Sequence, residues 1–381
     1  MKKICYITTV HGTLRSFVLK TANFIHENTD WEISFICNYD ADFAQELPDY
    51  INYIPVNMAR GISLLGIKSM LEIKKILKRE KFDLVQFSTP NASLYAAIAS
   101  KMAKVPVRLY CQWGMVFVGF EGLKRKIFKA IEKLVCHLAT HVQPDSKSNL
   151  DFSIAEGLYP AAKGAVIWNG SACGINLSKF DVSKKEIYRA QMREALNIKP
   201  DDFVFGFVGR ITRDKGVNEL LAAFKELYSA HPNAKLIMVG VPENVQTLNQ
   251  DLYDWAQESS AVIFTGRSNV VEQHLSAMDT YILPSYREGF GMGVIEAEAM
   301  GVPVIVTDIP GPIDAMINEK TGLTVPKKDA VALENAMQEL LNNKELALAY
   351  GQNGIIHAKN NFEQQQFLEN VLNNRKKLLG K

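Results

Sequence analysis

Short apolar runs alternate with helical patterns along almost the whole chain, and this alternation restricts the possible folds more than any other feature. Residues 3–10 (KICYITTV) and Asp83–Phe87 have the composition of strands, and segments with apolar residues three or four positions apart follow them. Strands that alternate with helices predict parallel βαβ units, and therefore an α/β fold. A second alternation starts at Val204, so we expect two similar halves.

The stretch between the two halves, Phe180 to Pro200, is charged and has no clear strand pattern. We interpret it as a linker. The expected domains are residues 1–180 and 181–361, which suits a chain of 381 residues with 47% hydrophobic content.

Composition excludes several classes of protein. The net charge of +2 gives no reason to expect a nucleic-acid partner. Five scattered cysteines argue for a reducing compartment and against a disulfide scaffold. No run approaches the roughly 18 apolar residues that a transmembrane helix needs. We therefore expect a protein of a reducing compartment such as the cytoplasm, either soluble or on a membrane surface.

The most informative local stretch is Pro284–Pro303 (PSYREGFGMGVIEAEAMGVP). It predicts a loop, a helix of about ten residues, and an end at Gly301. Gly289, Gly291 and Gly293 would let a ligand lie against the backbone where the first helical N–H groups point outwards, a geometry that suits an anion.

Two glutamates lie around this predicted anion site. Glu288 precedes it and Glu296 is on the following helix. If they are functional, their carboxylates should accept hydrogen bonds from hydroxyl groups on either side of a phosphate, as in a nucleoside diphosphate sugar. Alternatively, Glu296 complements the helix dipole and Glu288 is a solvated loop residue.

A basic loop, Gly209–Gly216, directly follows the first predicted strand of the second half. Arg210, Arg213 and Lys215 would stabilise the charge of a departing diphosphate, with arginine as a two-pronged donor and lysine as a point charge. The alternative is a solvated basic loop.

Together the two motifs resemble the donor site of the family-four retaining glycosyltransferases. The resemblance rests on E-x7-E followed by E-A-M-G-V-P-V, and on G-R-x-x-x-x-K-G in the basic loop. It implies two Rossmann-like domains that face each other across a cleft (the GT-B fold), with residues 362–381 packed back on the first domain. It also implies that Glu288 contacts the donor sugar, Glu296 the ribose, and Arg210 and Lys215 the diphosphate.

Further site candidates come from other loops. For the donor they are Gly12, Arg267 and the backbone amides of Phe290, Gly291, Met292 and Gly293, and for the acceptor they are His11, Gln112, Trp113 and Asn169. His11 is equally interpretable as a solvated loop histidine. Many relatives have a histidine in the loop after the fourth strand, where this chain has Cys111-Gln112-Trp113-Gly114, so that contact is in doubt.

A narrower resemblance connects Thr8–Phe17, Gly119–Lys126 and Trp168-Asn169-Gly170 to members that build bacterial capsule, exopolysaccharide or O-antigen units. It implies a UDP-sugar donor, an undecaprenyl-diphosphate-linked or other glycan acceptor, and no metal or other cofactor. The segment Leu123–Leu138 has a basic face that is either solvated or binds an anionic membrane. Its cations are Lys124, Arg125, Lys126, Lys129 and Lys133, and Lys74, Lys75, Lys78 and Arg79 are a possible extension.

Two metal interpretations are weaker. Asp40-Ala41-Asp42 imitates a D-x-D motif but follows a Rossmann-type strand, so we expect a solvated loop. His137 and His141 lie beside Cys136, yet no H-E-x-x-H glutamate is present, and core or capping roles suit both histidines better. For function, the alternatives are a nucleotide-sugar epimerase or hydrolase and a catalytically silent nucleotide-sugar-binding subunit.

Overall fold

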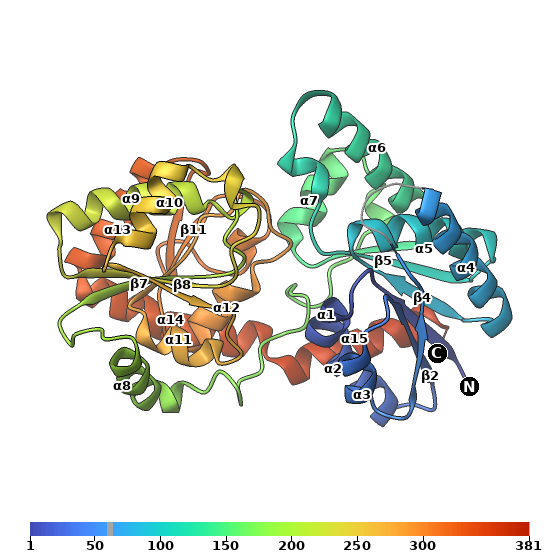
Figure 1. Cartoon of the computed structure of the whole chain (residues 1–381). Helices are drawn as coiled ribbons and strands as arrows, with labels where there is room; N and C mark the ends of the chain where they lie inside the picture. The colour runs from blue at the N-terminus through green and yellow to red at the C-terminus, as the bar shows by residue number, and fades with distance from the viewer. Residues whose placement is uncertain (59–63, 381) are drawn as a thin grey trace. The chain divides into compact units, whose positions relative to one another are not determined.

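The computed structural model describes residues 1–58 and 64–380, and the chain divides into two compact units (Figure 1). Unit 1 comprises Met1–Cys173 together with the C-terminal residues from Gln365, and unit 2 comprises Gly174–Gln364. Each unit is a six-stranded, entirely parallel sheet covered by helices on both faces. This confirms the predicted α/β fold of two Rossmann-like domains.

Unit 1 has the strand order β3-β2-β1-β4-β5-β6. Its strands are β1 Lys3–Ile7, β2 Glu32–Cys37, β3 Ile51–Pro55, β4 Leu84–Phe87, β5 Val107–Gln112 and β6 His141–Pro144. Its helices are α1 His11–Thr13, a π-helical turn Leu14–Val18, α2 Leu19–Glu27, α3 Ala41–Glu46, α4 Leu64–Glu80, α5 Pro90–Met102, α6 Gly122–Leu138, α7 Lys147–Ala155 and α15 Gln364–Leu378, with 3₁₀ turns at Val116–Gly119 and Ala161–Lys163.

Unit 2 has the strand order β12-β11-β10-β7-β8-β9. Its strands are β7 Phe203–Val208, β8 Ala234–Val239, β9 Val262–Gly266, β10 Thr280–Leu283, β11 Val304–Thr307 and β12 Gly322–Val325. Its helices are α8 Lys185–Ala195, α9 Val217–Ala230, α10 Gln250–Glu258, α11 Val271–Ala277, α12 Met292–Ala299, α13 Ala330–Asn342 and α14 Lys344–Phe362, with 3₁₀ turns at Val182–Lys184, Arg213–Lys215, Val245–Thr247 and Pro312–Asp314.

In each unit the strand order reverses direction between two central neighbours, β1 and β4 in unit 1 and β7 and β10 in unit 2. The connections leave such a pair of strands towards opposite faces, which opens a crevice at their carboxyl ends where ligands bind in sheets of this kind. The loops after β7 and β10 are the predicted basic loop and the predicted glycine-rich loop. The fold therefore places both motifs at the switch point of unit 2.

The predicted linker is wrong over part of its length, because Lys185–Ala195 forms helix α8. Its buried Arg193 donates to Asp279 Oδ2 (2.8 Å) and to the carbonyl of Asp202 (3.1 Å), and Arg189 donates to Asp279 Oδ1 (2.6 Å). These bonds tie α8 to the amino ends of β7 and β10. The charge that suggested a linker therefore holds a helix in place.

Asp40-Ala41-Asp42 is not a solvated loop either. Asp40 is the N-cap of α3, and its side chain accepts a hydrogen bond from the Phe43 amide (2.8 Å). This is a common structural use of aspartate at a helix start.

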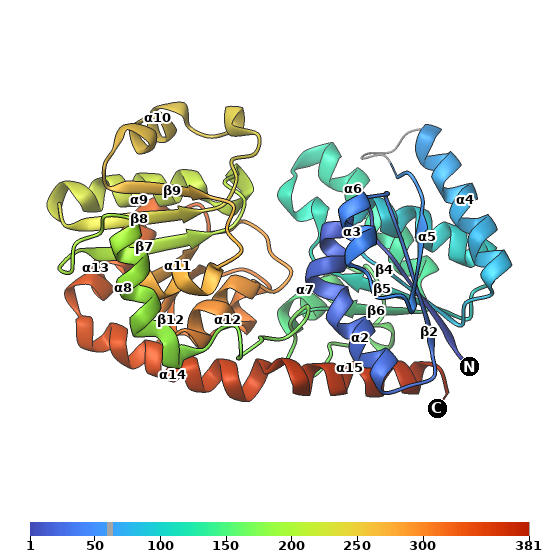
Figure 2. The same cartoon turned by 60° about the horizontal axis from the view of Figure 1, so that its bottom comes forward.

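Helix α15 completes unit 1 (Figure 2, red). Its Arg375 is only 2% exposed, and its guanidinium donates to Gln86 Oε1 of β4 (3.0 Å) and Gln143 Oε1 of β6 (2.8 Å). The burial of this cation lowers its pKa. One buried side chain thus fixes α15 across two strands of the sheet.

Cys5, Cys37, Cys111, Cys136 and Cys173 are all free thiols. Within the described residues, no helix is long and apolar enough to cross a membrane.

Candidate active site

Two loops at the switch point of unit 2 are bonded to each other. The Tyr286 amide donates to the carbonyl of Asp214 (2.9 Å), and Arg287 Nη2 donates to Asp214 Oδ2 (2.9 Å). Burial opposes ionisation of Asp214, but the Thr212 hydroxyl and the charge of Arg287 outweigh burial and lower its pKa. The basic loop and the glycine-rich loop therefore behave as one structural element.

Gly216 allows this close approach. It has φ of +71°, and a Cβ at this position would lie 1.9 Å from the carbonyl oxygen of Pro284. Only glycine accepts both the left-handed backbone and the close neighbour.

Within the joined loops, Lys215 and Glu288 form an ion pair. Lys215 Nζ lies 2.6 Å from Glu288 Oε1, and the two side chains are 19% and 13% exposed. The Ser285 hydroxyl donates to the same oxygen (2.7 Å), and the Thr307 hydroxyl of β11 donates to the Ser285 carbonyl (2.5 Å). Two residues that the motifs assign to one donor are thus brought into direct contact and held by a second layer of bonds.

The glycine-rich loop leads into α12. Gly291, at φ of +93°, is its N-cap, and it has no side chain with which to cap the first turn. A Cβ on Gly293 would lie 2.3 Å from Tyr281 Oη. Phe290 is buried and its ring packs against Phe362, so only its backbone is available to a ligand. A cap made of backbone alone suits an anion.

Glu296 lies one turn further along α12, beside a pair of residues that sequence patterns do not predict. Burial raises its pKa to about 7, the charge of Lys179 opposes that rise, and Glu272 adds to it. Lys179 Nζ lies 3.6 Å from Glu272 Oε2 and donates to the carbonyl of Asn269 (3.3 Å). The predicted ribose carboxylate is therefore poised to change charge near neutral pH.

Arg210 and Arg267 are on the surface of unit 2. Arg210 Nη1 lies 3.1 Å from Glu243 Oε2, and both side chains are about half exposed, at 52% and 44%. Arg267 follows β9 and is exposed.

At the switch point of unit 1, two threonines join the loops after β1 and β4. The Thr9 amide donates to Thr89 Oγ1 (3.1 Å), and the two hydroxyls lie 3.0 Å apart. Thr89 has φ of +70°, a backbone strain that is typical of functional loops. His11 Nδ1 lies 3.3 Å from Asp40 Oδ2, and a Cβ added to Gly12 would meet no atom within 4 Å.

Gln112, an acceptor-side candidate, is 1% exposed. Its Nε2 donates to Glu132 Oε1 (2.6 Å), and its Oε1 accepts from the hydroxyls of Ser153 (3.0 Å) and Tyr159 (3.3 Å). Burial raises the pKa of Glu132, although both of its hydrogen bonds oppose the rise. Gln112 thus anchors the loop after β5 from inside.

The other acceptor-side candidates lie nearer the surface. The Trp113 ring is 5.5 Å from the Phe17 ring, and Asn169 is exposed in a turn where Trp168 and Gly170 have positive φ.

No group of three or more His, Cys, Asp or Glu side chains in residues 1–58 and 64–380 is arranged to hold a metal ion. His141 Nδ1 lies 3.0 Å from the Thr140 hydroxyl. Metal independence remains a prediction.

Comparison with known proteins decides the family. The model of "Glycosyl transferase 4-like" proteins matches residues 3–146, and that of "Glycosyl transferases group 1" matches residues 189–357. The capsular polysaccharide biosynthesis glycosyltransferase CapM of Staphylococcus aureus is 32% identical over 86% of this chain and 86% of its own length. The chain belongs to the family-four glycosyltransferases. As a member, it is a glycosyltransferase.

A second relative is the UDP-Gal:alpha-D-GlcNAc-diphosphoundecaprenol alpha-1,3-galactosyltransferase of Escherichia coli, 27% identical over 84% of this chain and 82% of its own. Among solved structures, Anabaena Alr3699/HepE in complex with UDP has a TM-score of 0.78 at 18% identity, over 99% of this chain and 100% of that one. This likeness confirms the GT-B fold.

Two features of the candidate site cannot be predicted from the sequence of this glycosyltransferase alone. The Asp214–Arg287 bond joins residues 73 positions apart, and Lys179 and Glu272 lie on separate elements. Arg213-Asp214-Lys215 and Tyr286-Arg287-Glu288 carry complementary charges within the motifs, and that complementarity was the available signal for the first bond. No local pattern signals the second.

Proposed function

We propose that this glycosyltransferase moves a hexose or N-acetylhexosamine from a UDP-sugar to a hydroxyl of a lipid-diphosphate-linked sugar, with retention of the anomeric configuration, in bacterial surface polysaccharide synthesis. The observation that carries the proposal is the Lys215–Glu288 pair in the loops that lead to the start of α12, where Gly291 leaves the first turn without a side-chain cap. The lysine, the glutamate and the backbone N–H groups at the start of α12 lie at the same edge of one sheet. The names of the Staphylococcus aureus and Escherichia coli relatives support the process, the donor and the acceptor class.

The donor would lie across the switch point of unit 2. Its diphosphate would contact Lys215, Arg210 and the amides of Phe290–Gly293, because developing negative charge is stabilised by fixed donors in a partly dry site. Glu288 would orient the sugar, and Glu296 would accept hydrogen bonds from the ribose diol. Arg210 would have to leave Glu243, an exposed pair whose separation costs little.

The reaction needs no enzyme nucleophile. The acceptor hydroxyl attacks the anomeric carbon from the side of the leaving group, the bond from that carbon to the diphosphate oxygen breaks, and a donor phosphate oxygen takes the proton. Because a neutralised diphosphate leaves readily, cations take the role that a general acid has in a glycosidase. Lys215 supplies the neutralising charge in this scheme.

The test measures sugar transfer from UDP-sugars to a panel of lipid-diphosphate-linked acceptors, with the product linkage determined by NMR. Transfer with an α-linked product from an α-linked donor supports the proposal. Conversion of the donor without acceptor would instead support an epimerase or hydrolase, and saturable UDP binding without turnover on any acceptor would support a silent binding subunit.

The acceptor class makes a membrane surface the natural partner of unit 1. On α6, Leu123 is 73% exposed and Ile127 51%, next to basic residues that include Lys124 and Lys126. Helix α4 also exposes Ile67 and Leu71. Exposed apolar side chains beside lysines are typical of helices that lie in an anionic membrane interface. We therefore extend the proposal to peripheral binding on the cytoplasmic face.

Two of the five predicted membrane cations are already paired. Glu156, the C-cap of α7, lies 2.9 Å from Arg125 and 2.7 Å from Lys129. Substitution of Leu123 and Ile127 by serine should therefore weaken vesicle binding more than substitution of Arg125 and Lys129 by alanine, as measured by flotation with anionic vesicles. Equal losses for both double variants would contradict a docking surface centred on the apolar residues.

A further inference from the structure

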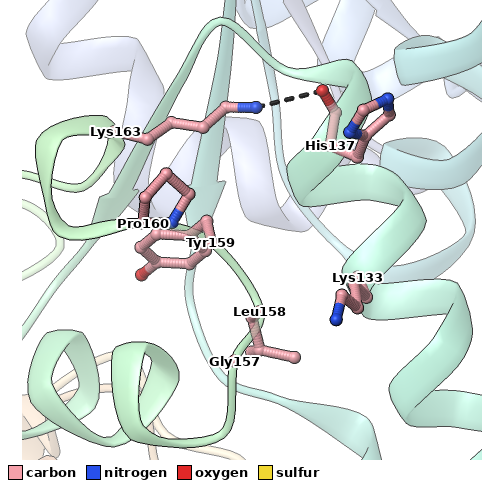
Figure 3. Close-up of a pocket in the computed structure, with 7 residues that line it drawn as sticks. All are labelled: Lys133, His137, Gly157, Leu158, Tyr159, Pro160 and Lys163. Carbon is pink, nitrogen blue, oxygen red and sulfur yellow. Dashed lines mark hydrogen bonds between the residues drawn. The ribbon is translucent and has the colours of Figure 1, made fainter.

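A pocket of about 380 Å³ lies in unit 1 at the carboxyl end of α6 (Figure 3). Lys133 and His137 come from α6, and the loop after α7 supplies the other side. The lining consists of Lys133, His137, Gly157, Leu158, Tyr159, Pro160 and Lys163. These seven residues include two lysines and a histidine and no carboxylate.

Lys163 is the most constrained cation of the pocket. Its Nζ donates to the carbonyl of His137 (3.0 Å), drawn as the dashed line in Figure 3, which uses one of its three N–H donors. Burial lowers the pKa of Lys163, and the charges of Arg108 and Lys101 lower it further, although Cys136 acts in the opposite direction. A bound anion would relieve this repulsion between cations.

A capping role accounts for part of this arrangement. Arg108 Nε donates to the carbonyl of Leu138 (2.8 Å), so Arg108 and Lys163 both bind terminal carbonyls of α6, where cations are favoured. Capping does not account for Lys133, which lies one turn earlier and is exposed.

Two carboxylates close to the pocket residues in sequence, Glu132 and Glu156, have other partners. Glu132 accepts from Tyr110 and Gln112 inside the unit, and Glu156 is paired with Arg125 and Lys129. Neither of them lines the pocket. The positive charge of the pocket is therefore left for a ligand.

We propose that this pocket binds a phosphate ester through the charges of Lys133 and Lys163, with its organic group against Tyr159 and Pro160. Lysine is a point-charge binder of phosphate, and His137 adds a ring donor. The site lies at the opposite end of α6 from Leu123, about 20 Å away along the helix. It is thus distinct from the donor site of unit 2 and from the apolar docking surface.

Tyr159 connects the pocket to the loop after β5. Its ring lines the pocket, and its hydroxyl donates to Gln112 Oε1 (3.3 Å), the residue that anchors this loop. A ligand in the pocket would contact Tyr159, and through its hydrogen bond to Gln112 it would affect the loop after β5. The sequence assigns this loop to the acceptor side.

The experiment follows the backbone amides of Leu158 and Lys163 by NMR while inorganic phosphate or glycerol 3-phosphate is added at constant ionic strength. Wild-type protein should show saturable shifts. Lys133→Ala and Lys163→Ala should each weaken binding roughly tenfold, the loss of one charged hydrogen bond. Lys147→Ala, which removes a 67% exposed lysine of α7 in the same unit, should change nothing. Lys163→Ala also removes a cap of α6, so Lys133→Ala is the decisive variant if the other fails to fold.

A second arm asks where the phosphate comes from. Flotation with phosphatidylcholine vesicles, with and without phosphatidylglycerol, is compared for the same variants. Binding that needs phosphatidylglycerol and falls in Lys133→Ala but not in Lys147→Ala assigns the pocket to a lipid headgroup. Saturable shifts with the soluble esters alone assign it to a free metabolite.

The proposal is overturned if neither ligand form depends on Lys133, or if Lys147→Ala causes an equal loss. UDP binding, measured on the same samples, reports on unit 2. A failure of the phosphate-binding proposal can therefore be distinguished from a failure of the proposed transfer reaction.

Discussion

Lys215 Nζ and Glu288 Oε1 lie 2.6 Å apart, although 73 positions separate the two residues in the chain. The cation to which we assign leaving-group stabilisation is thus paired with a carboxylate of the same site. A donor diphosphate must compete for that cation, and the carboxylate released by the competition becomes an acceptor for sugar hydroxyls.

Loss of either member of this pair should abolish most turnover. We expect Lys215→Ala and Glu288→Ala each to lower kcat by roughly 100-fold or more, the scale found for removal of one group that stabilises a leaving charge. Initial rates of sugar transfer measure the effect. Lys359→Ala, on an exposed position of α14, is the matched control, and near-normal rates in both site variants would refute the assigned roles.

Donor affinity should fall as the pH drops below neutrality. Burial raises the pKa of Glu296 to about 7, and a protonated carboxyl accepts hydrogen bonds from a ribose diol less well. Calorimetric titration with UDP between pH 5.5 and 8.5 should show this dependence in the wild type and lose it in Glu296→Gln. A pH profile of the same shape in the variant would assign the titration to another group.

The same carboxyl should oppose stability at high pH. A folded-state pKa of about 7 lies above the ordinary value of 4.5, so the folded protein binds the proton more tightly than the unfolded chain does. This contribution is fully present below pH 4.5 and is lost as the pH rises through 7. Glu296→Gln should therefore raise the melting temperature by a few degrees at pH 8 and leave it almost unchanged at pH 5.

Gly216→Ala and Gly266→Ala form a matched pair that tests the contact between the loops. Their φ angles are +71° and +70°, but an added Cβ meets the Pro284 carbonyl only at position 216. Gly266→Ala should cost about 1–2 kcal/mol, the backbone strain alone. Gly216→Ala should cost clearly more and should also lower transfer activity. Equal denaturation midpoints for the two variants would show that the stability of the protein does not depend on the close contact between Gly216 and the Pro284 carbonyl.

The sequence predicts most of the central strands because strands buried on both faces are nearly continuous apolar runs. It does not predict β3 (INYIP) and β12 (GLTV), each of which lies at one of the two edges of its sheet and carries polar residues. It also misreads α8, because the arginines that anchor this helix give the segment the composition of a linker.

The site shows the same division. Glu288, Glu296, Arg210 and Lys215 are predicted from two short motifs, each of which covers one loop and one helix start. The pairings between loops, and the placement of Lys179 and Glu272 beside Glu296, depend on which strands become neighbours, and no local pattern encodes that order.

Arg375→Ala should destabilise unit 1. It leaves the buried acceptors of Gln86 and Gln143 without their donor, at about 1–3 kcal/mol each. Thermal unfolding followed by hydrogen exchange in β4 and β6 measures the loss, and Lys377→Ala, an exposed position on the same helix, is the control. Exchange rates in β4 and β6 equal to those of the control would show that Arg375 contributes nothing to this sheet.

Because α15 supplies part of the core of unit 1, the order of synthesis limits the order of folding. The first 173 residues leave the ribosome while the whole of unit 2 has still to be made, a delay of roughly 10–40 s at 5–20 residues per second. During that time Gln86 and Gln143 face solvent or a chaperone. The nascent first half matures only when the last helix emerges.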